Sequence, residues 1–142
     1  MDIHRSNGTL NIYGRAAIAK EILEAEKGSK LYFYQARGES FDPTRIADTW
    51  FVKFMHILSR GIIRENVSQI FQQVSFVSFN YDRCVKHFLT HALQRSHAIR
   101  ADQAAQITSM LRIIHPYGVI GDLDSVPFGA TRANYIELAG GI

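Results

Sequence analysis

Asn80, Tyr81 and Asp82 directly follow an almost wholly apolar run, residues 74–79, with the sequence VSFVSF. A short run rich in β-branched and aromatic residues is typical of a strand that is buried on both faces. In open α/β sheets, ligands bind where such a strand ends and the next helix begins. We therefore expect these three side chains to line a binding site, where they can hydrogen-bond a polar ligand.

A second apolar run, residues 111–117, predicts another buried strand and carries His115 and Tyr117 near its end. Residues two apart on a strand share a face, so these two side chains are expected to point the same way. If the two strands are neighbours, the side chains of His115 and Tyr117 converge with those of Asn80 and Asp82 on one crevice. An amide, a carboxylate and a histidine could bind sugar hydroxyls, orient a water molecule and accept a proton.

Each of these polar residues also has a purely structural interpretation. Asn80 and Asp82 could cap the following helix, because Asn and Asp are preferred N-caps, and for Asp82 alone this alternative stays open. Cys84 falls on an inward apolar stripe, which favours a buried structural cysteine over a nucleophile. His87 and His91 have the spacing of a two-histidine metal half-site. Without an evident third ligand, a solvated helix face is favoured and no metal site is predicted.

Helical periodicity and turn signals define the elements that must position this site. The first dozen residues are interpreted as loop, and residues 30–35 as either a strand or a buried helical turn. Helices are predicted at residues 15–27, 43–60, 65–73, 82–95 and 101–111, with a short helix near 133–139. The second of these should bury one broad apolar face that comprises Ile46, Trp50, Phe51, Phe54, Ile57 and Leu58.

The order strand, helix, helix, strand gives a crossover that is long enough for a parallel pair. Only two strands are convincing, although a parallel sheet needs more partners to cover its edges and faces. The predicted fold is therefore an α-rich α/β fold, with a partial, Rossmann-like parallel sheet flanked by helices. A fragment of a larger domain, an unusual α-rich form and a subunit completed by another chain all fit this pattern.

Composition restricts the class of protein. With 142 residues, 46% hydrophobic and 20% charged, the chain fits one ordinary globular domain. The formal net charge of +3 is spread along the sequence, which gives little support to a nucleic-acid binder. A single cysteine, the absence of a signal-peptide pattern and the absence of an apolar run of about 20 residues predict a cytoplasmic protein without a membrane span.

Two motifs resemble the sirtuin-like (silent information regulator-like) domain family. They are FNYDR at residues 79–83 and IIHPYG at residues 113–118, and the resemblance extends over about residues 10–130. More narrowly, the chain resembles bacterial sirtuin-like proteins that hydrolyse NAD in anti-phage defence. In that family an Asn-Tyr-Asp motif ends one strand and a His-Gly motif ends a later one, and both line the nicotinamide-ribose pocket.

The resemblance implies specific roles for residues of this chain. Asn80 would hold the ribose and position the attacking water, while Asp82 would contact the ribose or the nicotinamide carboxamide. Tyr81, Tyr117 and Gly118 would also bind the substrate. Here Tyr117-Gly118 replaces the family's His-Gly step. Because tyrosine is a poor base at neutral pH, His115 would have to act as the base from the same face.

The family also has a Gly-Ala-Gly-type loop that cradles the pyrophosphate, and this sequence has no counterpart. We therefore expect residues 1–142 to form a single sirtuin-like domain truncated at both ends, which alone binds NAD weakly or not at all. The implied function is an NAD glycohydrolase domain or its catalytic half, with NAD as the substrate. The alternative is a non-catalytic module that binds a protein partner or a nucleotide, with self-association or a partner chain expected.

Overall fold

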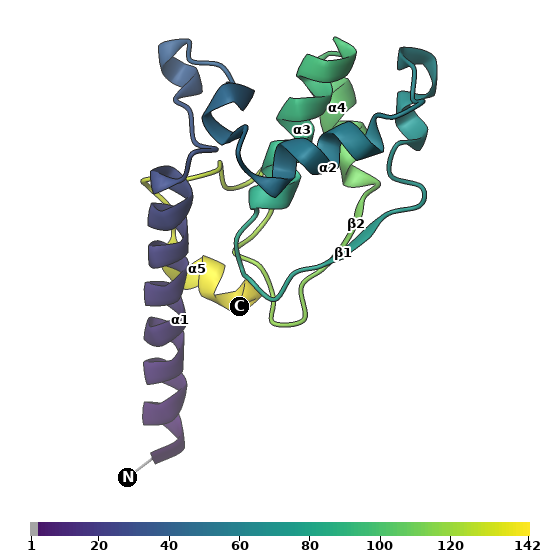
Figure 1. Ribbon diagram of the computed structural model, residues 1–142. Coiled ribbons are helices and arrows are strands. Elements are labelled where there is room, and N and C mark those ends of the chain that lie inside the picture. The colour runs from purple at the N-terminus through teal and green to yellow at the C-terminus, as the bar shows by residue number, and fades with distance from the viewer. Residues whose placement is uncertain (1–2) are drawn as a thin grey trace. The chain divides into compact units, whose positions relative to one another are not determined.

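The computed structural model describes residues 3–142, with the side chains of residues 10–35 and 37–142. The described chain is mostly helical and contains a small parallel sheet of two strands, which confirms an α/β protein in which helices dominate (Figure 1). It divides into two compact units. Unit 1 comprises the residues up to Ser29 together with Ser78–Arg83 and His115–Ile142, and unit 2 comprises Lys30–Val77 and Cys84–Ile114.

Unit 1 is built on the long helix α1 (Ile3–Gly28), against which the short helix α5 (Tyr135–Leu138) and the 3₁₀ turn η4 (Ala139–Gly141) pack. The buried side of α1 repeats at helical spacing and forms a hydrophobic cluster with the loop before α5; its fully buried members are Ala19, Leu23 and Ile120. The prediction of a loop over the first dozen residues is wrong for the described ones, because α1 begins at Ile3. The Asn-Gly pair at residues 7–8 suggested a turn, but an isolated glycine costs a helix only about 1 kcal/mol.

Unit 2 contains α2 (Trp50–Leu58), α3 (Cys84–His97) and α4 (Ala101–Ser109). The 3₁₀ turns η1 (Gln35–Arg37) and η2 (Pro43–Ile46) precede α2, and η3 (Arg64–Gln69) follows it. Helix α3 packs against both α2 and α4. The core of the unit is a set of buried apolar side chains that includes Met55, Phe88, Leu89, Leu93, Ala104 and Ile107. Unit 2 therefore owes its core mainly to helix packing.

The single helix predicted for residues 43–60 is wrong, because the segment forms η2 and then, after a turn, α2. Asp42 begins η2 by accepting a hydrogen bond from the Thr44 backbone N–H, at 2.9 Å. The predicted inward face of the helix is also partly wrong. Trp50 is 50% exposed and Ile57 is 66% exposed, whereas Met55 is buried. Because α2 is apolar around most of its circumference, its sequence pattern does not define one inward side.

The sheet consists of β1 (Ser75–Val77) and β2 (Arg112–Ile114), which run parallel with Phe76 opposite Ile113. The predicted parallel pair with a two-helix crossover is therefore confirmed. The prediction of strands buried on both faces is wrong, because each strand has only three residues and Val77 and Ile114 are 57% and 40% exposed. On the other face, the Phe76 ring lies 5.2 Å from the Phe54 ring of α2. Residues 30–35 form no strand.

None of the described helices is both long enough and apolar enough to cross a membrane. The longest, α1, has 26 residues and carries charged side chains along its length. This agrees with the composition, which gave no apolar run of the required length.

Candidate active site in unit 1

The six residues predicted to form a site all lie in unit 1, on two segments that follow the two strands. The first segment, residues 78–83, carries Asn80, Tyr81 and Asp82; the second, residues 115–118, carries His115, Tyr117 and Gly118. A direct hydrogen bond joins the segments, between His115 Nδ1 and the backbone carbonyl oxygen of Asn80 at 3.0 Å. Residues far apart in the sequence thus lie side by side.

The hydrogen bond to Asn80 determines which nitrogen of His115 carries the proton. A carbonyl oxygen can only accept a hydrogen bond, so Nδ1 must be the donor. In the neutral ring the lone pair then lies on Nε2, which leaves that nitrogen able to accept a proton. Because the bond uses the main chain of Asn80, the side-chain amide of Asn80 remains exposed to bind something else.

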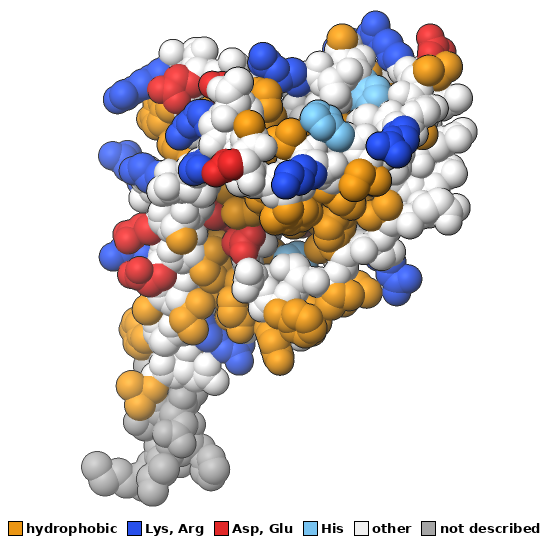
Figure 2. All heavy atoms as spheres, in the orientation of Figure 1, with side chains coloured by type: hydrophobic (Ala, Val, Ile, Leu, Met, Phe, Trp, Pro, Cys, Tyr) orange, Lys and Arg blue, Asp and Glu red, His pale blue; other side chains and the backbone are white. Residues whose placement is uncertain are grey.

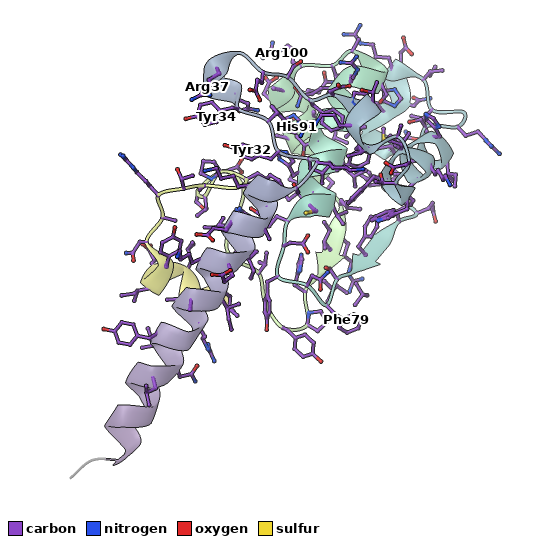
Figure 3. All side chains as sticks on the ribbon, turned by 60° about the vertical axis from the view of Figure 1, so that its left-hand side comes forward. Tyr32, Tyr34, Arg37, Phe79, His91 and Arg100 are labelled. Carbon is purple, nitrogen blue, oxygen red and sulfur yellow. The ribbon has the colours of Figure 1, made fainter. Side chains whose placement is uncertain are left out.

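The same two segments also carry two aromatic rings that lie close to each other. The rings of Phe79 and Tyr117 lie 6.1 Å apart in a tilted arrangement, and both side chains are largely exposed. Figure 3 shows Phe79 on the loop after β1. Tyr81 instead turns inward and packs against the unit 1 cluster of Ala19, Leu23 and Ile120. Of the two tyrosines predicted to contact a substrate, Tyr117 is thus the more accessible.

Gly118 occupies a position where only glycine fits. Its φ of +97° lies in the left-handed region, and a Cβ atom there would come within 2.1 Å of the Gly141 carbonyl oxygen. The next residue, Val119, donates its backbone N–H to the same oxygen at 2.9 Å. The close approach of these two backbone segments is therefore sufficient reason for the glycine, independently of any substrate.

Asp82 is half-buried. Helix α3 begins at Cys84, two residues later than the predicted start, so Arg83 and not Asp82 immediately precedes the helix. The alternative role of Asp82 as a helix cap stays a prediction. Cys84 itself is half-buried in the first turn of α3.

Sequence reasoning missed the residues that hold the first segment in place. Glu26 of α1 and Arg83 form a buried ion pair, 2.7 Å between Glu26 Oε2 and Arg83 Nη2, with side chains 1% and 3% exposed. A signal was available. Glu26 follows Leu23 by three residues on the buried stripe of α1, and a carboxylate in such a position requires a charged or hydrogen-bonding partner.

His87 and His91 were predicted to lie on a solvated helix face, which is wrong. His87 is buried, with Nε2 3.2 Å from the Leu31 carbonyl oxygen, and His91 is half-buried with its Nδ1 3.3 Å from the Gln94 amide nitrogen. The ring centroids of the two histidines are 4.6 Å apart, and His91 lies edge-on to the Phe33 ring. Figure 3 labels His91. Burial lowers the pKa of His91. This histidine pair therefore belongs to the packing of unit 2.

The site thus combines a histidine nitrogen that can accept a proton, an exposed amide, a half-buried carboxylate and an exposed phenol. Such a set can bind hydroxyl or amide groups and remove a proton from water, with no metal ion required for either step. Comparison of the chain with protein-family models, with curated proteins and with solved structures finds no match.

Proposed function

We propose that this chain acts in a sirtuin-like NAD glycohydrolase and supplies the residues that act at the ribose bound to nicotinamide. The observation that carries the proposal is the 3.0 Å bond from His115 Nδ1 to the Asn80 carbonyl oxygen. It joins the two motifs on which the resemblance to the sirtuin-like family rests. In the neutral ring it also places the lone pair on Nε2, the nitrogen that would act as the general base.

In the proposed reaction, water attacks the ribose C1′ and the bond between C1′ and the nicotinamide nitrogen breaks. The bonding electron pair stays on the departing nicotinamide, whose ring becomes neutral, and the transition state resembles an oxocarbenium ion. His115 Nε2 takes the proton that the water loses, and the Asn80 side-chain amide orients the water against the ribose. The products are nicotinamide and ADP-ribose.

The remaining predicted residues bind the substrate in this proposal. Asp82 accepts hydrogen bonds from the ribose or the carboxamide, while Tyr117 and the backbone at Gly118 border the nicotinamide. Tyr81 packs on the unit 1 cluster and acts mainly by holding the segment. The sequence has no Gly-rich pyrophosphate loop, so this chain should hold the diphosphate weakly and turn over NAD only when the NAD concentration is high. The proposed setting is anti-phage defence in a bacterial cytoplasm.

Nicotinamide release from NAD tests the proposal, at high concentrations of both NAD and protein. The parent chain should release nicotinamide, and Asn80→Ala and His115→Gln should each lower the rate by about a hundredfold or more. Asn80→Ala keeps the backbone carbonyl that accepts from His115, so it tests the side-chain amide alone. His56→Gln, at an exposed histidine of unit 2, is the matched control and should retain the parental rate. A parent chain without turnover would refute the hydrolase.

A second candidate function is a non-catalytic module that binds a protein partner. The observation that favours it is the uncovered face of the sheet, where Val77 and Ile114 lie opposite one another and both are exposed. Parallel sheets are normally covered on both faces, so an uncovered face that exposes two aliphatic side chains beside Ser75 and Arg112 is unusual. Figure 2 shows hydrophobic side chains, in orange, at the surface among charged ones.

Sedimentation in solution distinguishes this candidate from the first. A module that pairs through the sheet should self-associate at high protein concentration, and the double variant Val77→Ser, Ile114→Ser should return it to a monomer. The matched control is Met110→Ser, an exposed apolar residue just beyond α4. Association that persists in the double variant, or a parent chain that is monomeric and binds no partner, would count against the module.

A further inference from the structure

We propose that Glu26 is a positioning residue: its ion pair with Arg83 fixes the Asn80 segment so that His115 is held in the tautomer with the proton on Nδ1. The inference rests on the proposed function for its catalytic meaning. Its structural part concerns Glu26, Arg83, Asn80 and His115, which all lie in unit 1. None of the predicted site residues contributes to this ion pair.

Glu26 binds Arg83 at both its main chain and its side chain. Its Oε1 accepts hydrogen bonds from the Arg83 backbone N–H at 3.1 Å and from Arg83 Nε at 3.0 Å. Its Oε2 accepts from Arg83 Nη2 at 2.7 Å and from the Gly129 backbone N–H at 3.0 Å. Charge-assisted bonds of this kind are among the strong hydrogen bonds in proteins, so the backbone at residue 83 is firmly fixed to α1.

Arg83 extends the same network to the other side of unit 1. Its Nη1 donates to the Val126 carbonyl oxygen at 2.5 Å and to the Asp122 carbonyl oxygen at 3.5 Å. Its Nη2 also donates to the Pro127 carbonyl oxygen at 3.4 Å. The loop that follows the His115 segment is thus bound to the residue that ends the Asn80 segment.

These anchors restrain the segment that carries the Asn80 carbonyl oxygen, which also accepts a hydrogen bond from the Ser78 hydroxyl at 3.3 Å. Residue 83 is fixed to Glu26, and Tyr81 is packed on α1, so Asn80 precedes a segment that is held at two positions. On the other side, the Gly118 backbone N–H donates to the His115 carbonyl oxygen at 3.1 Å. With both backbones held, the imidazole of His115 faces an acceptor and must present a proton on Nδ1. Without Glu26 as the anchor, the Asn80 carbonyl oxygen should be free to move. His115 should then no longer be restricted to the tautomer with the proton on Nδ1.

The test measures the two ring nitrogens of His115 by NMR in protein labelled with ¹⁵N-histidine, together with kcat and KM for nicotinamide release. His115→Gln identifies the His115 signals among the six histidines. Glu26→Gln is the informative variant, because its amide can satisfy only one of the two donor pairs and turns an NH₂ group toward the other. Glu24→Gln, an exposed residue of the same helix that pairs with Lys20, is the matched control.

In the parent and in Glu24→Gln, His115 should carry its proton on Nδ1. In folded Glu26→Gln the proton should be shared between the two nitrogens, and kcat should fall about ten- to a hundredfold while KM stays close to the parental value. If Glu26→Gln does not fold, Glu26→Asp carries the same prediction, since it keeps the charge and withdraws both oxygens by one methylene group.

An unchanged Nδ1 tautomer in the folded variant would overturn the inference, whatever the activity. If the parent chain itself releases no nicotinamide, the proposed function fails, while the tautomer measurement still decides whether Glu26 positions His115. The two failures are therefore distinguishable.

Discussion

Replacing Glu26 with alanine should destabilise the protein strongly, because it leaves a buried cation without its partner. Glu26 accepts four hydrogen bonds, and the variant would leave the Arg83 guanidinium and the Gly129 backbone N–H without their acceptor. Breaking a buried ion pair by removing one partner costs about 3–5 kcal/mol. Domains of this size are stable by only about 5–15 kcal/mol, so the loss is a large fraction of the total.

The double variant Glu26→Leu, Arg83→Met separates the penalty of an unpaired charge from the value of the pair. Replacing both charges with apolar side chains of similar size is often neutral or stabilising by about 1–4 kcal/mol, so the double variant should be more stable than Glu26→Ala. The matched control is Glu24→Ala, which removes an exposed pair with Lys20 of 3.5 Å and should cost no more than about 0.5 kcal/mol.

The assay is urea denaturation followed by far-ultraviolet circular dichroism, with the free energy of unfolding obtained by linear extrapolation. Far-ultraviolet dichroism suits these variants because α1, the longest helix, lies in unit 1. A cost for Glu26→Ala as small as that of Glu24→Ala would contradict a buried ion pair that depends on Glu26. It would mean that the Arg83 charge is solvated without Glu26.

Three further predictions concern other parts of the molecule. Burial lowers the pKa of His91 below 6.5, so the unfolded chain binds a proton more readily than the folded chain and the free energy of unfolding should fall as the pH drops below 6.5. In urea titrations at several pH values, His91→Phe should reduce this pH dependence. Gly118→Ala should lower the free energy of unfolding by at least about 2 kcal/mol, because it adds a backbone clash to the strain of a positive φ, whereas Gly121→Ala, with the same φ of +97° and only side-chain neighbours, should cost about 1–2 kcal/mol. Thermal unfolding compares the two variants, and equal costs would contradict the clash at Gly118. Trp50, the only tryptophan, is half exposed, so a neutral quencher such as acrylamide should quench its fluorescence in the native protein; resistance to quenching would place it in a core.

The sequence predicted the parts of the fold that depend on local pattern. The two apolar runs identified β1 and β2, and the two helices between them required a parallel crossover, which the structure has. The His115 ring also contacts the segment that carries Asn80, but through the Asn80 main chain, so the convergence of the four side chains stays a prediction. Such agreement follows because strand pairing and crossover length are constrained by backbone geometry alone.

What the sequence failed to predict depends on contacts between distant residues. The inward face of α2 was misjudged because Trp50, Phe51 and Phe54 surround much of the helix, so only tertiary packing selects Met55 as its buried residue. The pairing of Glu26 with Arg83 was not predicted, because the two residues lie 57 positions apart in the sequence. No local pattern links two such residues, although a charge on a buried stripe does signal that a partner is needed.

Nicotinamide release from NAD by the parent chain and by His115→Gln tests the proposed hydrolase most directly, with the same high protein concentration and the same high NAD concentration for both. We expect release by the parent and a loss of about a hundredfold or more in the variant, because the base on Nε2 is gone. Equal release by the two proteins would show that His115 is not the base, and no release by either would contradict the hydrolase itself.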